Sequence, residues 1–297
     1  MAGAESALAP DEPAIAAERP PALWRRLGKH RLFMTGAVIF GFMLVLAIFA
    51  DLIQILPPEK MQVRLRFKSP DFPYPLGTDN YGRDIWSRLV HGARLSLAIG
   101  FAVALVTGIA GTLIGVVAGY FRRFDGPLMR LMDALMAFPA ILLALAIAAA
   151  LGPSAINAVI ALAAVYTPRT ARIVRSTVLV VREMDYVQAA KACGARDLWI
   201  VWRHVLPNSM APLLVQLTFI FAYAILAEAV LSFLGVGPPP PAPTWGSMIA
   251  EGKDYLREAP HICLFPGMAV ALTCLGINLL GDGLRDVLDP RLRVQIG

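Results

Sequence analysis

Charged residues are scarce in this sequence of 297 residues: Asp, Glu, Lys and Arg make up 16% of it, whereas hydrophobic residues make up 57%. Soluble domains carry about 25% charged residues. This deficit indicates that much of the folded surface does not face water, and it excludes an ordinary soluble protein. The net charge of +6 does not indicate nucleic acid binding, because the basic residues adjoin long apolar runs, as they do at the cytoplasmic ends of membrane helices.

Residues that carry chemistry are also few. The three cysteines, Cys193, Cys263 and Cys274, form no C-x-x-C pair, which excludes a disulfide framework and a zinc site. The four histidines are scattered, and the sequence has no phosphate-binding G-x-x-x-x-G-K-S/T loop, no H-E-x-x-H and no G-x-S-x-G. We therefore predict no catalytic, cofactor or metal site, and a membrane-embedded enzyme is disfavoured. If ATP drives this protein, another subunit must bind it.

Long apolar runs are abundant, and a helix needs about 20 mostly apolar residues to cross a bilayer. The third and fourth runs are separated only by Gly152-Pro153-Ser154, so we expect a tight hairpin there. The predicted fold is an all-α integral membrane protein with six transmembrane helices. The expected spans cover about residues 33–56, 95–120, 134–151, 155–175, 209–235 and 262–281.

The charge distribution predicts the orientation. Residues 1–23 are rich in Ala, Pro and Glu and are expected to form a disordered cytoplasmic tail. Residues 24–297 then form one transmembrane domain, which begins with a basic cluster at residues 25–31. With both termini in the cytoplasm, 18 of the 27 Lys and Arg residues lie in cytoplasmic segments, as the positive-inside rule requires.

Small residues and prolines suggest how the helices pack. Gly111, Gly115 and Gly119 are spaced by four residues, so they share one helix face and allow a second backbone to approach closely. Pro139 and Pro168 each lack an amide donor, and each is expected to bend its span. These features predict helix packing and no chemistry.

Ionisable residues inside the spans suggest two alternative functions. Glu228 is expected to face the protein interior and to be hydrogen-bonded, because a charge inside a bilayer costs about 3 kcal/mol. It could serve an ion-driven secondary transporter as a proton site, and Asn278 is a second polar candidate. Arg169, Arg172 and Arg175 repeat every third residue as in a voltage sensor, but snorkelling to lipid headgroups explains them better than a channel does.

The loop at residues 183–207, EMDYVQAAKACGARDLWIVWRHVLP, is the most informative segment. It is predicted to form two short helices on the cytoplasmic side. Gly194 can end the first helix, since glycine adopts the left-handed conformation at low cost. Asp197 is a candidate N-cap for the second helix, and Pro207 is expected to stop it.

The surface of this loop is suited to a partner. Ala189 and Ala190 are small, so another protein can come close, and Lys191, Arg196 and Arg203 flank them. The loop therefore has two interpretations: a helix-turn-helix that docks a cytosolic partner, or an amphipathic segment that lies on the membrane.

Gln188-Ala189-Ala190-x-x-x-Gly194, followed by Leu206-Pro207, resembles the loop of ABC importer permeases that docks on the ATPase subunits. The family usually has Glu where this chain has Gln188, and Ile where it has His204. The resemblance implies that these residues form coupling helices. The implied coupling residues are Gln188, Ala189, Ala190, Gly194, Asp197, Arg203, Leu206 and Pro207.

Further segments resemble the second permease type of the dipeptide, oligopeptide and nickel branch. This resemblance implies a bacterial inner-membrane subunit that forms half of a pore with a homologous permease. It also implies two cytosolic ATPase subunits that bind ATP and an extracytoplasmic substrate-binding protein. Di- or oligopeptides are the expected substrates, with nickel, glutathione and opines open. The matching segments are residues 76–84, 87–88, 92–97, 231–235, 243–246, 278–286 and 288–291.

Overall fold

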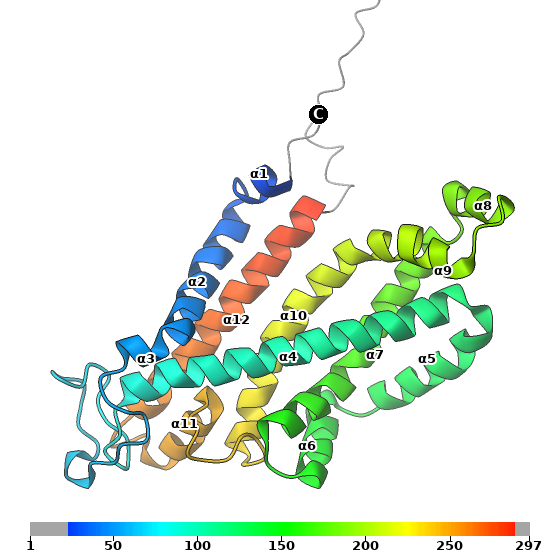
Figure 1. Cartoon of the computed structure of the whole chain (residues 1–297). Helices are drawn as coiled ribbons and strands as arrows, with labels where there is room; N and C mark the ends of the chain where they lie inside the picture. The colour runs from blue at the N-terminus through cyan, green and yellow to red at the C-terminus, as the bar shows by residue number, and fades with distance from the viewer. Residues whose placement is uncertain (1–22, 289–297) are drawn as a thin grey trace, which may run out of the picture.

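The computed structural model describes residues 23–288, and every regular element in this part of the chain is helical (Figure 1). The predicted tail at residues 1–23 lies almost wholly outside the described residues. The helices are α1 Leu23–Leu27, α2 Arg31–Ile48, α3 Ala50–Ile53, α4 Ile85–Tyr120, α5 Arg122–Met136, α6 Ala140–Leu151, α7 Ala155–Val181, α8 Asp185–Ala192, α9 Asp197–Ile200, α10 Leu206–Phe233, α11 Trp245–Gly252 and α12 His261–Leu288. Short turns are η1 Val63–Leu65, the π-helical η2 Val201–Val205, and η3 Lys253–Tyr255.

Four helical segments of the described chain are long and apolar enough to cross a membrane: α2, α4, α12 and the continuous run from α9 through η2 to α10. A fifth candidate is the pair of α5 and α6, which is bent by 91°. The helix α7 is not among them, because its second half carries three arginines. Length and composition thus support four to five of the six predicted spans.

Two helix boundaries differ from the ends of the predicted spans, which stay predictions. The helix α4 begins at Ile85 rather than near residue 95, because the Asp84 carboxylate accepts hydrogen bonds from the backbone N–H of Ser87 at 3.0 Å and from its hydroxyl at 2.6 Å. At its other end the helix reaches Tyr120, so its 36 residues give a rod of about 54 Å. The first span, expected at 33–56, is divided at Phe49 into α2 and the short α3.

The third span, expected at 134–151, is not one helix. The chain breaks between α5 and α6, and Pro139 forms the extended N-cap of α6. Proline has no amide hydrogen and its ring clashes with the preceding turn, so the helix cannot continue through it. Pro139 therefore lies at the 91° break between α5 and α6, whereas Pro168 lies inside the continuous helix α7.

The glycine stripe packs α4 against α7, as predicted. A Cβ atom at Gly111 would lie 2.6 Å from the Cβ of Thr170, and one at Gly119 would lie 2.8 Å from the Cβ of Val178. At Gly115 the nearest atom is the carbonyl oxygen of Ala171, at 2.6 Å. Because the residue numbers rise together on both helices, α4 and α7 run parallel.

The other main helix pairs are antiparallel. A Cβ at Gly100 of α4 would lie 2.7 Å from Ile225, and one at Gly108 would lie 2.9 Å from Leu217, so α4 and α10 run in opposite directions. The same test shows that α2 and α12 are antiparallel. A Cβ at Gly36 would meet the backbone of Gly276, and a Cβ at Gly283 would meet Phe33. The direction of the chain therefore alternates through the bundle.

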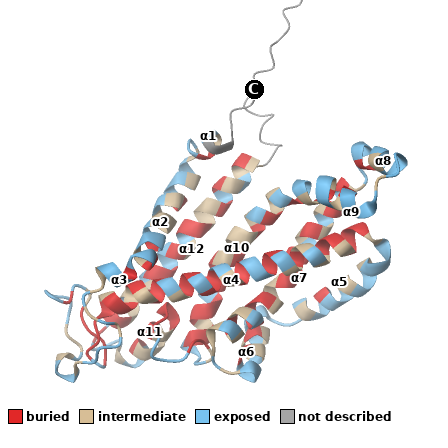
Figure 2. Cartoon of the chain, in the orientation of Figure 1, coloured by how far each residue is buried: buried red, intermediate tan, exposed pale blue. Residues whose placement is uncertain are grey.

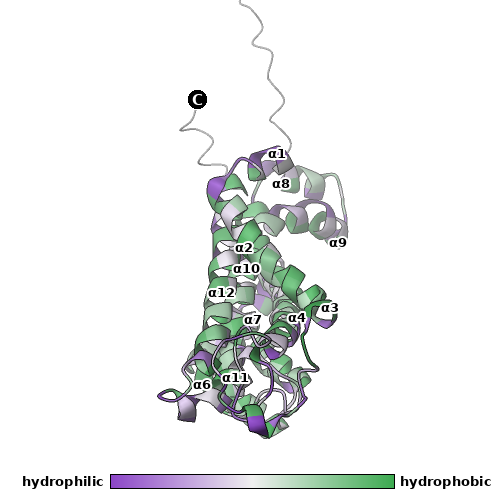
Figure 3. Cartoon of the chain, turned by 90° about the vertical axis from the view of Figure 1, so that its left-hand side faces the viewer, coloured by the Kyte–Doolittle hydropathy of each residue, from purple (hydrophilic) through white to green (hydrophobic). Residues whose placement is uncertain are grey.

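Burial follows these contacts (Figure 2). Small and aliphatic side chains of α4, α6, α7 and α10 form the largest apolar cluster, while α2 leaves Val38, Phe42 and Val45 exposed. Hydrophobic residues follow the lengths of the helices, and hydrophilic residues gather near their ends (Figure 3). This is the pattern of a bundle whose outer surface meets lipid rather than water.

Candidate functional site: the α8–α9 loop and the polar contacts of the bundle

The turn between α8 and α9 has the geometry that the sequence predicted. Gly194 has a φ of +80°. Its N–H donates to the carbonyl of Lys191 at 2.9 Å, and the N–H of Ala195 donates to that of Ala190 at 3.0 Å. This is a Schellman motif, in which a left-handed residue satisfies the last carbonyls of a helix. Gly194 therefore ends α8.

Asp197 has a different role from the predicted one. The N-cap of α9 is Arg196, whose backbone is extended, and Asp197 is the first helical residue. Its carboxylate accepts a hydrogen bond of 2.7 Å from the hydroxyl of Tyr120. The N-cap prediction was wrong because the carboxylate of Asp197 binds this distant hydroxyl instead of a backbone N–H of α9. The bond connects α9 to the end of α4.

Pro207 does not stop the second helix, contrary to the prediction. The helix continues from Asp197 to Phe233 because η2 has a π-helical turn just before the proline, and the N–H of Leu206 reaches the carbonyl of Val201. Pro207 then falls at the start of α10, where a missing N–H is tolerated. The predicted second short helix is thus the beginning of a long helix that runs to Phe233.

The α8–α9 loop is attached to the bundle by an apolar cluster. Val187 of α8, Ile200 of α9 and Val205 of η2 are fully buried, and they pack with Val174 and Val178 of α7. The ends of α4 and α10 contribute to the same cluster. Displacement of the loop must therefore move the ends of three long helices.

The opposite face of the loop is open. Gln188, Ala189 and Arg203 are exposed, and Pro207 is exposed as well. Of the other predicted coupling residues, Gly194 and Asp197 are exposed, while Ala190 and Leu206 are half-buried. The face is thus made of small and polar residues at its α8 end.

Three large apolar side chains extend this face, and the sequence analysis did not single them out. Leu198 is 69% exposed, Trp199 52% and Trp202 70%. Exposed apolar side chains of this size can contact a partner protein or lipid. Trp202 also lines an apolar groove with Leu105, Ile109 and Leu113 of α4.

Two of the three periodic arginines are paired, which corrects their interpretation as snorkelling side chains. Arg175 donates to both carboxylate oxygens of Asp125 at 2.5 and 2.7 Å, and Arg172 donates to Asp133 at 2.6 Å. Arg169 is exposed. The two pairs join α7 to α5, and their order makes these helices antiparallel.

Glu228 is fully buried in α10, as expected, and its carboxylate accepts hydrogen bonds from the hydroxyls of Ser96 at 3.1 Å and Ser232 at 2.6 Å. Asn278 is half-buried on α12. Within residues 23–288 no hydrogen bond joins the two, so they do not form one polar site. Glu228 holds α10 to α4 through Ser96.

The end of the bundle opposite α8 is held together by ion pairs between charged side chains. Arg83 lies 2.6 Å from Asp79 and also contacts Glu251, while Arg88 lies 3.3 Å from Asp79 and 3.0 Å from Glu251. Asp79, Arg83 and Arg88 are buried. This ion cluster links the segment before α4 to α11, and the sequence analysis did not identify it.

No group of three His, Cys, Asp or Glu side chains in the described part of the chain is arranged to hold a metal ion. The arrangement is instead that of a multi-pass helical membrane protein with the exposed α8–α9 loop at one end and a buried ion cluster at the other. The family comparisons identify this class more closely. Residues 111–294 match the model described as "Binding-protein-dependent transport system inner membrane component". Residues 22–70 match the "N-terminal TM domain of oligopeptide transport permease C".

Full-length relatives agree with these matches. The chain is 56% identical to a peptide transport system permease protein of Brucella abortus biovar 1, over 91% of this chain and 92% of the relative. It is 44% identical to the dipeptide transport system permease of Alkalihalophilus pseudofirmus, over 91% and 89%. It is 41% identical to the glutathione transport system permease of Pectobacterium atrosepticum, over 91% and 92%. The chain belongs to the family of binding-protein-dependent transport inner-membrane components and is a permease subunit.

A solved structure has a similar fold. Inward-facing conformations of the MetNI methionine ABC transporter contain a chain that matches with a TM-score of 0.55 and 20% sequence identity. The match covers 68% of this chain and 96% of that one. At this identity the likeness concerns the fold alone.

Proposed function

We propose that this chain forms half of the translocation pore of an ATP-driven importer for di- or oligopeptides in a bacterial inner membrane. A homologous permease supplies the other half, two cytosolic ATPase subunits bind the ATP, and an extracytoplasmic binding protein delivers the substrate. The open face of the α8–α9 loop carries this proposal. The named substrates of the relatives from Brucella and Alkalihalophilus support a peptide as cargo.

The proposed topology has six crossings with both termini in the cytoplasm. The sixth crossing is α7, whose 27 residues span about 40 Å, more than the roughly 30 Å of a bilayer core. Because α4 and α7 are parallel, one crossing must lie between them, and the bent pair of α5 and α6 supplies it. The alternation of helix direction supports the same count, and the excess of Lys and Arg supports the orientation.

In this topology the α8–α9 loop faces the cytoplasm, on the same side as the start of α2 and the end of α12 (Figure 1). Exposed Gln188, Ala189 and Arg203 meet the ATPase subunit, together with the apolar surface formed by Leu198 and Trp202. Gln188 also donates to the carbonyl of Arg182 at 2.8 Å, a bond that an ionised glutamate could not donate.

Closure of the ATPase pair on ATP then displaces the α8–α9 loop. The displacement reaches α4, α7 and α10 through the apolar cluster around Val187 and Ile200. Nucleotide binding thereby favours one of two arrangements of the bundle, which open the pore to opposite sides. Gly194 keeps the two helices of the loop at their angle during this movement.

Purification from the native host in mild detergent, followed by mass spectrometry, tests the proposal. We expect a second six-span permease and one or two P-loop ATPases to accompany the tagged chain. A variant in which Leu198 and Trp202 are both changed to Ser should lose the ATPases and keep the permease. Recovery of the chain alone, with uptake that needs no ATPase, would instead favour the ion-driven transporter with Glu228 as its proton site.

A further inference from the structure

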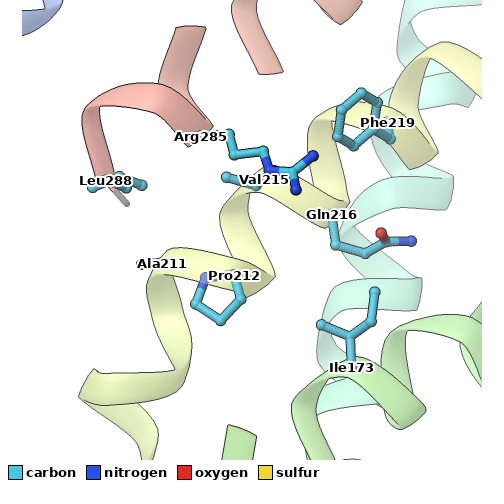
Figure 4. A pocket seen from close by; sticks show the side chains of 8 residues that line it. All are labelled: Ile173, Ala211, Pro212, Val215, Gln216, Phe219, Arg285 and Leu288. Carbon is cyan, nitrogen blue, oxygen red and sulfur yellow. The ribbon is translucent and has the colours of Figure 1, made fainter. Parts of the chain in front are cut away.

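A cavity of about 430 Å³ opens between α7, α10 and α12 (Figure 4). Its volume lies within the range of roughly 300–1,000 Å³ that is typical of ligand pockets. Ile173, Pro212, Val215 and Phe219 give it apolar walls, and Gln216 and Arg285 are its polar residues. These positions place it at the end of the bundle that carries α8.

The two polar side chains of this cavity are open to a ligand. Gln216 is only 8% exposed as a residue, yet its amide atoms are not among the enclosed polar atoms of residues 23–288, so they open onto the cavity. Arg285 is an exposed residue and has no carboxylate within 4 Å among the same residues, whereas Arg172 and Arg175 are each paired with an aspartate.

The arrangement of these groups suits one kind of ligand. In Figure 4 the guanidinium of Arg285 extends from α12 toward α10, where Val215 and Gln216 lie. A guanidinium and an amide N–H₂ are both hydrogen-bond donors, so each can bind a carboxylate oxygen. The apolar walls leave no acidic group to oppose such an anion or to attract a cation.

We propose that this cavity binds the C-terminal carboxylate of the transported peptide on its way to the cytoplasm, an inference that rests on the proposed function. Arg285 supplies the charge and Gln216 a second hydrogen bond. Ile173, Val215 and Phe219 contact the peptide side chains without selecting among them, because apolar contacts are not directional. The cavity thus recognises the end that every unmodified peptide shares.

Cysteine protection in the assembled transporter tests this binding. The complete complex is reconstituted in phosphatidylcholine vesicles with Ala211→Cys as a reporter, in a Cys193→Ser background that removes the exposed native thiol. Dialanine should slow maleimide labelling of the reporter at least about fivefold, and dialanine amide should not. Arg285→Gln should abolish the protection, Arg285→Lys should keep part of it, and Gln216→Leu should weaken dialanine binding about tenfold.

A matched control removes a charge elsewhere. Arg31 is the exposed first residue of α2 and does not line the cavity, so Arg31→Gln should leave the protection unchanged. Equal protection by dialanine and its amide, or protection that survives in Arg285→Gln, would overturn the inference. Protection by anionic phosphatidylglycerol without peptide would also overturn it, since the cavity would then hold a lipid phosphate.

The proposed function fails in a different way. Absence of ATP-driven dialanine uptake by the assembled wild-type transporter would remove the proposed function and the inference together. Intact uptake with no difference between dialanine and its amide would remove the inference alone. A KM for uptake that rises in Gln216→Leu, with ATP hydrolysis unchanged, would support a binding role over a structural one.

Discussion

The two ends of α4 are held in opposite ways. At the Ile85 end, Asp79, Arg83, Arg88 and Glu251 form a buried ion cluster in which each charge faces an opposite one. At the Tyr120 end, the α8–α9 loop rests on an apolar cluster, with one hydroxyl–carboxylate bond to Asp197 beside it. Ion pairs and charged hydrogen bonds demand a fixed geometry, whereas apolar contacts tolerate sliding.

Exposed apolar side chains occur at both ends. Phe72 is 91% exposed in the segment before α4, and the loop end leaves Leu198, Trp199 and Trp202 exposed. The difference therefore lies in the attachment, which is ionic at the first end and apolar at the second. The comparison suggests that one end is fixed and the other is built to be moved, and substitutions at either end test this difference.

The largest effect is expected at the fixed end. Asp79→Ala leaves Arg83 and Arg88 to share Glu251, and breaking a buried ion pair in this way costs about 3–5 kcal/mol. Thermal unfolding in detergent measures the loss. Asp254→Ala, at an exposed acid on the same side, is the control and should cost less than about 0.5 kcal/mol. A small loss in both variants would contradict the contrast between the ends.

The second effect concerns α4, the long helix that joins the two ends. Gly115→Ala introduces a methyl group 2.6 Å from the carbonyl oxygen of Ala171 and 2.7 Å from the Cβ of Val174, and overpacking of this kind costs about 1–3 kcal/mol. Gly41→Ala on α2 meets nothing within 4 Å and should be neutral or slightly stabilising. Unfolding midpoints of the two variants compare them directly, and equal midpoints would refute the close α4–α7 contact.

The third effect concerns the movable end. Gly194→Val forces a β-branched residue into a left-handed conformation, at a cost of about 1–2 kcal/mol, although the added Cβ meets no atom within 4 Å. We expect peptide uptake to fall while ATP hydrolysis and membrane insertion persist. Gly194→Asn should retain uptake, because asparagine tolerates this conformation. Wild-type uptake in the valine variant would rule out this role of the turn.

The smallest effect depends on pH. Hydrogen bonds from Arg94 and then His91 hold the pKa of the Asp51 carboxyl below its usual range. Because the folded protein favours the ionised form, this contribution to stability is present at neutral pH and is lost as the pH falls through the lowered pKa. Asp51→Asn should flatten the acid side of the stability profile slightly, since the pair is exposed. An unchanged profile would show that the pair contributes nothing.

Features that depend on neighbouring residues could be predicted from the sequence. The membrane class follows from composition, the glycine stripe from a four-residue period, and the end of α8 from a glycine after an amphipathic run. The interior position of Glu228 follows from the cost of burying a charge. None of these required knowledge of which helices meet.

Features that depend on distant residues could not be predicted. The pairing of Arg172 and Arg175 with α5 requires the 91° break at Pro139, which folds α5 along α7. The hydroxyl of Tyr120, 77 positions earlier in the chain, draws Asp197 away from a capping role. The start of α4 at Ile85 could not be predicted, because the first turns of this helix are polar and lie outside the apolar run.

The π turn at Val201–Val205 has a geometric consequence for the loop. Each residue of an α-helix advances about 100° around the axis. One extra residue in a turn therefore rotates the side chains on one side of that turn relative to those on the other. Here the extra residue brings Ile200 and Val205 to the same buried side. Deleting one residue of this turn would rotate α9 about the axis of α10, so the phase of one helix determines the direction in which the exposed face of the loop points.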